Sequence, residues 1–593
     1  MPRGTIRFPT VGIALGAGLL VAECVIWIRS SLDSFGGGGI WEPLLEGLAV
    51  YVVAGGVLDL LVQRLAPVRF ASSPILRGLP LVLLAFAAHW TFGIVAFMAT
   101  FTIPVAIAWA FAVHVRWGIP LAVGMALFGL APALPGASVG LLSADLPDDW
   151  SEGPSFVVVV LDALRWDHSS LSGYSRDTTP NLAAVARRGV RFERAYATSC
   201  WSIPSHASLF TGLMPRRHGA DFESLRLHDG AITLAWLLSA RGYETVGFSA
   251  NPYVASTTGL AQGFSRFDDL WRPTAMRTML ISRQFLAAIA GRDKDKGGAE
   301  VVASFKRWHD GRATKRPYFS FVNFMEPHAP YQDGPLGTKF VDSDLPASEL
   351  ARIGDEAFKA GWLGTQLDDE SRAVALDLLD GAAASADRYL GEILDIVGDE
   401  AVVVVLADHG ELVGEHGLYG HHTGLYEQLI RIPMAMAGPG VPQGTVIEGL
   451  VSIVDIMPTL LSMAGVDVPD LDGIDLTPVL SGEVALADRI VNAEHFRAIY
   501  PTQLWPRNRT EEEMRVIRAR RGAAVGRTLK RVVSQDGTDY GYDLVSDPFE
   551  QSPFDGASTG YPASIPEMPD IHIRPVELDP EQIEALRSLG YVH

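Results

Sequence analysis

The chain has 593 residues, a formal net charge of −20 and only two cysteines, Cys24 and Cys200. The acidic balance, without any Lys/Arg-rich block, excludes a nucleic-acid partner from the expected functions. The cysteine count excludes a disulfide framework. The length allows several domains.

The N-terminal region is almost continuously apolar between residues 8 and 142. A helix needs about 20 apolar residues to cross a bilayer, so this region predicts five transmembrane helices. They are expected at 8–28, 43–63, 78–96, 98–115 and 118–142. The first is not expected to be a cleaved signal peptide, because further spans follow it. Residues 1–145 are therefore predicted to form an all-α membrane region in contact with lipids.

Basic residues predict the orientation of these spans. Arg3 and Arg7 precede the first span. Arg64, Arg69 and Arg77 lie between the second and third, and Arg116 lies between the fourth and fifth. With five spans, all of them fall on the cytoplasmic side, and everything after residue 145 lies outside. This predicts a multi-pass protein of the cytoplasmic (inner) membrane with an extracytoplasmic catalytic domain. If the third and fourth spans were one helix, the soluble part would face the cytoplasm.

A polar linker, 146–154, leads into alternating strands and helices. The first predicted strand is Phe156–Leu161, and a helix begins at Pro180 with Thr179 as N-cap and ends at Gly189. The later strands are predicted at 190–197, 243–249, 317–324 and 401–406, and the later helices at 234–240 and 370–396, with a charged helical insertion at 273–315. This alternation predicts an α/β domain, 155–484, with a mostly parallel central sheet covered on both faces.

The character of the chain changes after residue 485. Strands are expected at 529–533 and 542–545, and a final helix begins after Asp579 and ends at Gly590. Residues 485–593 are therefore predicted to form a smaller C-terminal subdomain.

Two predicted strands end in groups that can bind a metal. Asp162 follows the first strand, and Asp408 and His409 follow the strand at 401–406. In open α/β sheets, ligands bind at the carboxyl ends of the strands. Two carboxylates and an imidazole suit one divalent cation, and Gly410 allows a sharp turn after them.

A third segment, 201–212, predicts a nucleophile. Pro204 suits the first turn of a helix, which places Ser202 at the helix N-terminus. Free N–H groups and the helix dipole favour an anion there. A serine hydroxyl beside a metal is a candidate activated nucleophile, whereas by itself it would be a helix cap.

Between residues 155 and 482 the chain resembles the sulfatase family of the alkaline-phosphatase-like superfamily. The similar segments follow one another in order: 161–168 (LDALRWDH), 178–182 (TTPNL), 204–212 (PSHASLFTG), 323–331 (NFMEPHAPY), 408–411 (DHGE), 414–417 (GEHG), 425–427 (LYE) and 454–460 (VDIMPTL). The resemblance implies an alkaline-phosphatase-like/sulfatase fold.

The resemblance also implies roles for individual residues. Asp162, Ser202, Asp408 and His409 would hold the metal, with Ser202 also the nucleophile. The anionic group or the leaving oxygen would be handled by three histidines, His206, His328 and His421. His421 stands near where many members carry a lysine, and His422 competes with it for that role.

Two departures from the family bear on the chemistry. Typical members carry the motif Cys-x-Pro-x-Arg, in which the cysteine is converted to formylglycine. This chain has Ser202 in place of that cysteine and His206 in place of the arginine. A serine motif can also be matured to formylglycine, but the missing arginine argues against it here. Ala163 replaces a second acid. An unmodified serine cannot expel sulfate as a formylglycine hydrate does, so Ser202 favours phosphoryl chemistry. The ligands suit Ca²⁺ or Mn²⁺, and also Mg²⁺ or Zn²⁺.

Three functions remain open from the sequence. The first is a membrane-anchored, metal-dependent hydrolase that cleaves sulfate or phosphate esters through a covalent intermediate on Ser202. Its substrate would be a sulfated or phosphorylated glycan, lipid or small molecule. The second is a transferase that moves a phospho-head-group from a lipid onto an envelope polymer. The third is a non-catalytic membrane sensor or scaffold that keeps the fold.

Overall fold

The computed structural model describes residues 153–221, 224–271, 295–312, 316–331, 334–342, 344–421, 423–496 and 519–567. These ranges contain no helix that is both long enough and apolar enough to cross a membrane. The five spans expected between residues 8 and 142, most of the insertion and the helix expected after Asp579 lie outside the described residues. The described residues fall within one compact unit.

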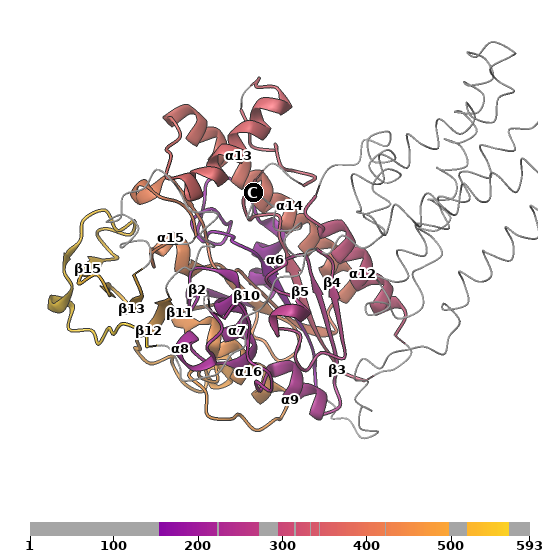
Figure 1. The fold of residues 1–593 in the computed structure, drawn as a ribbon. Coiled ribbons are helices and arrows are strands. Elements are labelled where there is room, and N and C mark those ends of the chain that lie inside the picture. Colours follow the sequence, from indigo (N-terminus) through magenta and orange to yellow (C-terminus); the bar gives the residue numbers. More distant parts are fainter. Residues whose placement is uncertain are drawn as a thin grey trace, which may run out of the picture. The chain divides into compact units, whose positions relative to one another are not determined.

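A nine-stranded mixed sheet forms the centre of this unit (Figure 1). Its strands run in the order β11-β2-β10-β6-β1-β5-β3-β4, and β9 pairs with β2. The strands are β1 (Ser155–Leu161), β2 (Val190–Tyr196), β3 (Glu244–Ser249), β4 (Arg266–Asp269), β5 (Tyr318–Phe324), β6 (Ala401–Leu406), β9 (Arg431–Ile432), β10 (Met434–Ala437) and β11 (Thr445–Ser452).

The parallel part of the sheet carries the strand ends of interest. β1 lies between β5 and β6 and runs parallel to both, and β3 and β4 extend this parallel set. β10 runs antiparallel to β6 and to β2, which makes the whole sheet mixed. The expected α/β fold is confirmed. β1 and β6 are buried along their lengths, as their apolar β-branched residues predict.

Helices cover both faces of the sheet (Figure 1). The first group is α6 (Pro180–Arg188), α12 (Gly298–Asp310) and α14 (Asp369–Val397). The second group is α7 (Ser202–Thr211), α9 (Leu234–Ala240) and α16 (Ile456–Met463), while α13 (Ala347–Leu363) packs on α14. Both layers are amphipathic or apolar and complete a core on each side of the sheet.

The start of α6 differs from the expectation in one detail. The helix begins at Pro180, but the side chain of Thr179 does not cap it. The Thr179 hydroxyl instead accepts a hydrogen bond from the Ser170 amide. The carboxylate of Asp387, on α14, accepts from the Asn181 and Leu182 amides at 2.9 and 2.8 Å. A tertiary contact therefore replaces the local cap.

The C-terminal part forms a second, antiparallel sheet with the order β12-β13-β14-β15-β16. Its strands are β12 (Val491–His495), β13 (Arg521–Val525), β14 (Leu529–Ser534), β15 (Asp539–Asp543) and β16 (Phe554–Asp555). The strand expected at 542–545 ends at Asp543, because that carboxylate accepts from the Val545 and Ser546 amides and turns the chain. Val545 is exposed.

Candidate active site

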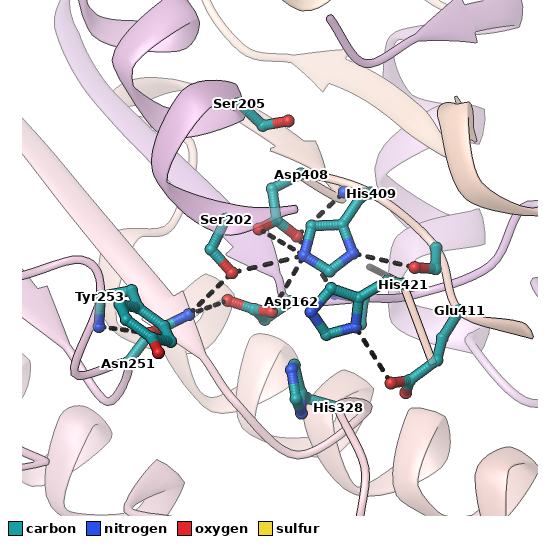
Figure 2. Close-up of polar contacts among 12 residues, drawn as sticks. Asp162, Ser202, Ser205, Asn251, Tyr253, His328, Asp408, His409, Glu411 and His421 are labelled. Atoms are coloured by element: carbon teal, nitrogen blue, oxygen red, sulfur yellow. Dashed lines mark hydrogen bonds and ion pairs between the residues drawn. The ribbon is translucent and has the colours of Figure 1, made fainter. Parts of the chain in front are cut away.

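Three candidate metal ligands converge at the carboxyl ends of two neighbouring strands. Asp162 directly follows β1, and Asp408 and His409 follow β6. Because these strands pair in parallel register, their ends meet at one edge of the sheet. One ligand atom from each residue lies within 4.8 Å of the others, and all three side chains are buried. The structure brings together the metal ligands that the sequence predicts (Figure 2).

Hydrogen bonds orient one oxygen of each carboxylate away from the common centre. Asp162 Oδ2 accepts from Asn251 Nδ2 at 2.7 Å and from Asn323 Nδ2 at 3.1 Å. Asp408 Oδ1 accepts from the amides of Ala163 and His409 at 3.1 and 3.0 Å. In the described part of the chain, the other oxygens, Asp162 Oδ1 and Asp408 Oδ2, are buried without a hydrogen-bond partner.

The imidazole of His409 is oriented in the same way. Its Nδ1 donates to the carbonyl oxygen of Gly410 at 2.8 Å, so the neutral ring presents the lone pair of Nε2. That nitrogen lies 3.3 Å from Asp408 Oδ2 and 3.9 Å from Asp162 Oδ1. Two carboxylate oxygens and a nitrogen lone pair repel one another unless a cation lies between them. The donor set therefore fits a divalent metal.

The electrostatics of the two carboxyl groups agree with this fit. Burial, followed by the neighbouring charge of Asp408, raises the pKa of Asp162 to about 7. Burial also raises the pKa of Asp408 to about 7. Two buried carboxylates side by side are costly without an opposing charge. A bound divalent cation would supply that charge.

Ser202 lies beside this centre as the first residue of α7. Its Oγ is 3.3 Å from His409 Nε2 and accepts from Asn251 Nδ2 at 3.1 Å. Trp201 before it is extended, so the chain enters the helix at the serine itself. The hydroxyl thus combines a helix N-terminus with the metal-binding centre. Ser205, one turn further along α7, lies apart from these contacts (Figure 2). Its hydroxyl donates to the carbonyl oxygen of Ser199.

His206 is also close, but its contacts differ from those expected of a group that meets the substrate. Its Nδ1 donates to the Ser202 carbonyl oxygen at 2.9 Å and lies 3.4 Å from Asp408 Oδ2. The ring packs edge-on against Phe321 and Phe210 and is fully buried. Burial lowers its pKa to about 3, so it is neutral. These contacts position the N-terminus of α7.

His328 and His421 lie together on the other side of His409. Their ring centroids are 4.8 Å apart, and the His421 centroid is 4.4 Å from that of His409. His421 Nδ1 donates to Glu411 Oε1 at 3.1 Å. The structure thus brings both histidines to the centre, whereas His422 lies outside the described residues.

Three loop features hold the centre in place. Ala163 has a φ of 60°, a left-handed conformation that is unusual for alanine, and its amide reaches Asp408. A Cβ on Gly410 would lie 2.0 Å from the Gln428 carbonyl oxygen, so close backbone approach, not a sharp turn, explains this glycine. Arg165 joins the two metal-binding loops through Asp167 and Glu415, at 2.7 Å each.

Asn251, Asn323 and Glu411 were not among the predicted site residues. Asn251 follows β3, and Asn323 lies near the end of β5, at the same edge of the sheet as Asp162. The rule that placed Asp162 at a strand end applies to both. Glu411 lies in the same motif as His409, two residues further along the chain. Cys200 is buried, and burial raises its pKa to about 12, which does not favour a nucleophilic thiolate.

Comparisons with known proteins identify the family. The sulfatase family profile matches residues 154–466, more than half of the chain. The delta 4,5-hexuronate-2-O-sulfatase of Bacteroides thetaiotaomicron is 26% identical over 367 residues, which cover 56% of this chain and 73% of that protein. The ulvan-active sulfatase of Formosa agariphila is 24% identical and covers 67% of this chain and 76% of its own.

A solved structure shares the fold. The phosphonate monoester hydrolase of Agrobacterium radiobacter superposes with a TM-score of 0.52 at 23% identity, over 68% of this chain and 91% of its own. At that identity the likeness concerns the fold alone. The family match, the fold and the converging site agree, and the chain therefore belongs to the sulfatase family of ester hydrolases.

Proposed function

We propose that this enzyme hydrolyses anionic monoesters, phosphate in preference to sulfate, through a covalent ester on Ser202. The observation that carries the proposal is the position of Ser202 Oγ, at the N-terminus of α7 and 3.3 Å from His409 Nε2. That nitrogen carries a lone pair, because His409 Nδ1 donates to the carbonyl oxygen of Gly410. The hydroxyl proton thus has an acceptor beside it.

Each residue has a part in this reaction. Asp162, Asp408 and His409 would hold a divalent cation, which would polarise the ester and lower the pKa of the Ser202 hydroxyl. Asn251 donates to Ser202 Oγ and fixes its position for in-line attack. Ser202 Oγ forms a bond to phosphorus while the bond to the leaving alcohol breaks. Water then cleaves the serine ester and releases the anion. His328 and His421 face the anionic group or the leaving oxygen.

The choice of phosphate over sulfate rests on the chemistry of serine. A sulfate ester on an unmodified serine has no internal route to expel sulfate and hydrolyses slowly. A phosphate ester beside a divalent cation is hydrolysed more readily. The relatives are named as sulfatases, and these names support hydrolysis of sulfate esters, with sulfated glycans as the class of substrate. The imidazole ligand favours Mn²⁺ or Zn²⁺ over Ca²⁺.

The test compares both ester classes on the full-length protein. We expect hydrolysis of 4-nitrophenyl phosphate to exceed that of 4-nitrophenyl sulfate, with a phosphate adduct on the peptide that contains Ser202. Ser202→Ala should abolish both signals, whereas Ser205→Ala, a serine in the same helix that bonds to Ser199, should retain them. Mass spectrometry of the untreated Ser202 peptide supplies the decisive control. A loss of two hydrogens would mean formylglycine, and the preference for phosphate would then be rejected.

We also propose that the apolar region 8–142 anchors this domain to the cytoplasmic (inner) membrane, with the catalytic domain on its outer side. The support is the composition of that region and the distribution of its arginines. The expected result is a full-length protein that stays with membranes after carbonate washing and whose catalytic domain is digested by protease added to spheroplasts. Protection of the domain until lysis would contradict the outward orientation.

A further inference from the structure

Lys530, on β14, carries a buried ammonium group that joins the C-terminal sheet to the catalytic domain. Its Nζ lies 2.8 Å from Glu550 Oε1 and 3.2 Å from Glu427 Oε1, and its side chain has no exposure to solvent. Glu427 is the first residue of the short helix α15 (Glu427–Ile430). We propose that Lys530 is a positioning residue, which fixes α15 and, through it, the two loops on which the candidate active site is built.

The helix α15 contacts both of these loops through its backbone. The carbonyl oxygen of Leu429 accepts a hydrogen bond from the amide of Gly410, the residue after His409, at 2.8 Å. The carbonyl oxygen of Ile430 accepts from the amide of Ala197 at 2.8 Å. Ala197 directly follows β2 and begins the segment that leads into α7 and the proposed nucleophile. A single helical turn thus holds the main chain of both loops.

The side chain of Glu427 is held on both carboxylate oxygens. Its Oε1 faces Lys530, and its Oε2 accepts from the hydroxyl of Tyr196, at the end of β2, at 3.0 Å. The amide of Glu427 donates to Glu550 Oε2 at 2.7 Å. Glu550 therefore bonds to the first residue of α15 and to Lys530 at once. The position of α15 depends on this group of three charged side chains.

The turn that carries Glu550 is shaped to hold its carboxylate inside the protein. Glu550 has a φ of 57°, in the left-handed region that residues other than glycine rarely adopt. Its side chain is buried, whereas that of Phe549 beside it is exposed. Such a conformation persists where the surrounding contacts require it. The contacts with Lys530 and with the amide of Glu427 meet that condition.

The ammonium group allows two buried carboxylates to lie together. Burial raises the pKa of Glu550, and the charge of Lys530 opposes that effect. Burial also disfavours the charged form of Lys530, but the charges of Glu550 and Glu427 raise its pKa above the usual value. Lys530 is therefore charged at neutral pH. Without it, Glu427 and Glu550 would repel each other in a medium that screens charge weakly, and α15 would be displaced.

The alternative is that these three side chains contribute to stability alone. A pair of variants separates the two roles. Lys530→Met leaves two buried carboxylates without a cation, whereas Lys530→Met/Glu550→Gln removes one of those charges and keeps an oxygen for the amide of Glu427. The double variant should therefore regain most of the melting temperature that the single variant loses. Because Glu427 still lacks its ammonium partner, α15 should remain displaced.

The direct measurement is hydrogen–deuterium exchange by mass spectrometry on the metal-free, full-length protein, at a temperature where thermal melts show every variant folded. We expect the peptides that contain Ala197 and Gly410 to exchange at least about tenfold faster in both Lys530 variants. That change corresponds to about 1.4 kcal/mol of local stability. Arg312→Met is the matched control, because it removes a cation 3.0 Å from Glu244 at the amino end of β3. It should leave the exchange of both peptides unchanged.

Two further readouts connect the displacement of α15 to the active site. Affinity for Mn²⁺ in calorimetry should fall about tenfold in both Lys530 variants, the low end of the effect of residues that support metal ligands. The value of kcat should fall as well, and this part alone rests on the proposed function. Wild-type exchange of both peptides in the Lys530 variants would overturn the inference, whatever happens to hydrolysis. Recovery of exchange together with melting temperature in the double variant would also overturn it, because the role would then be stability alone.

Discussion

Asn251 offers the sharpest single test of how the site is built, because its side chain orients both a proposed metal ligand and the proposed nucleophile. Its Nδ2 donates to Asp162 Oδ2 at 2.7 Å and to Ser202 Oγ at 3.1 Å, and the side chain is 1% exposed. In Asn251→Ala, Asp162 keeps only the 3.1 Å bond from Asn323 and can rotate Oδ2 toward the metal position.

The expected loss of metal affinity in Asn251→Ala follows from the hydrogen bond to Asp162 that is removed. A hydrogen bond to a charged group contributes about 1.5–3 kcal/mol, and a tenfold change in affinity corresponds to about 1.4 kcal/mol. We therefore expect metal affinity to fall roughly 10- to 100-fold, as is typical when a residue that orients a metal ligand is removed. The value of kcat should fall by at least as much, because Ser202 loses the same donor.

The assay is titration calorimetry with Mn²⁺, paired with steady-state hydrolysis of 4-nitrophenyl phosphate at saturating metal. Asn181→Ala is a matched control, because Asn181 also donates to a buried carboxylate, that of Asp387, at 2.9 Å. It should lower stability without changing metal affinity. The loss of the Asn251 bond to the Tyr253 amide will lower the melting temperature as well. A lower melting temperature with unchanged metal affinity and kcat would refute the reasoning.

Three further predictions concern stability and the loop after β6. Burial lowers the pKa of His218 to about 3, so below pH about 6.5 only the unfolded state gains its proton. As the pH falls below about 6.5, the free energy of unfolding should therefore decrease by at most about 1.4 kcal/mol per pH unit. Urea unfolding at pH 5 and at pH 7 should show a smaller difference in this free energy for His218→Gln than for the wild type. An equal pH dependence in the two proteins would contradict this role of His218. Gly410→Ala should abolish metal binding in calorimetry, because its Cβ would lie 2.0 Å from the Gln428 carbonyl oxygen, whereas Gly311→Ala, with 3.0 Å to its nearest atom, should bind normally. Equal binding by both would contradict the close-approach argument. Lys530→Met should cost about 3–5 kcal/mol in denaturant unfolding, because it leaves Glu550, 2.8 Å from the ammonium, buried and unpaired; a change below about 1 kcal/mol would exclude this.

Local sequence determined the main elements and the positions of the candidate ligands. The apolar run 402–406 specified a buried strand, and the groups after it had to lie at its carboxyl end. The strand ending at Leu161 and the helix beginning near Pro204 followed from similarly local signals. Such features depend on periodicity and on the conformational limits of proline and glycine, which each segment carries by itself.

Contacts between distant segments could not be predicted in this way. Asp387 caps α6 from a position about 200 residues later in the chain, so Thr179 was given a role that it does not have. His206 has a motif position typical of a substrate contact, yet its Nδ1 is used by the Ser202 carbonyl oxygen. Its surroundings, Phe210 and Phe321, come from different elements.

By itself, then, the sequence predicted the family and the α/β architecture, which are confirmed, and it singled out Asp162, Ser202, Asp408 and His409, which the structure brings together. Only the tertiary structure decided which oxygen of each carboxylate faces the centre, that Asn251 bonds to both Asp162 and Ser202, and that Glu411 bonds to His421. The reason is that residue type and strand position are encoded locally. The direction of a buried polar atom is set by partners that only folding brings within hydrogen-bond distance.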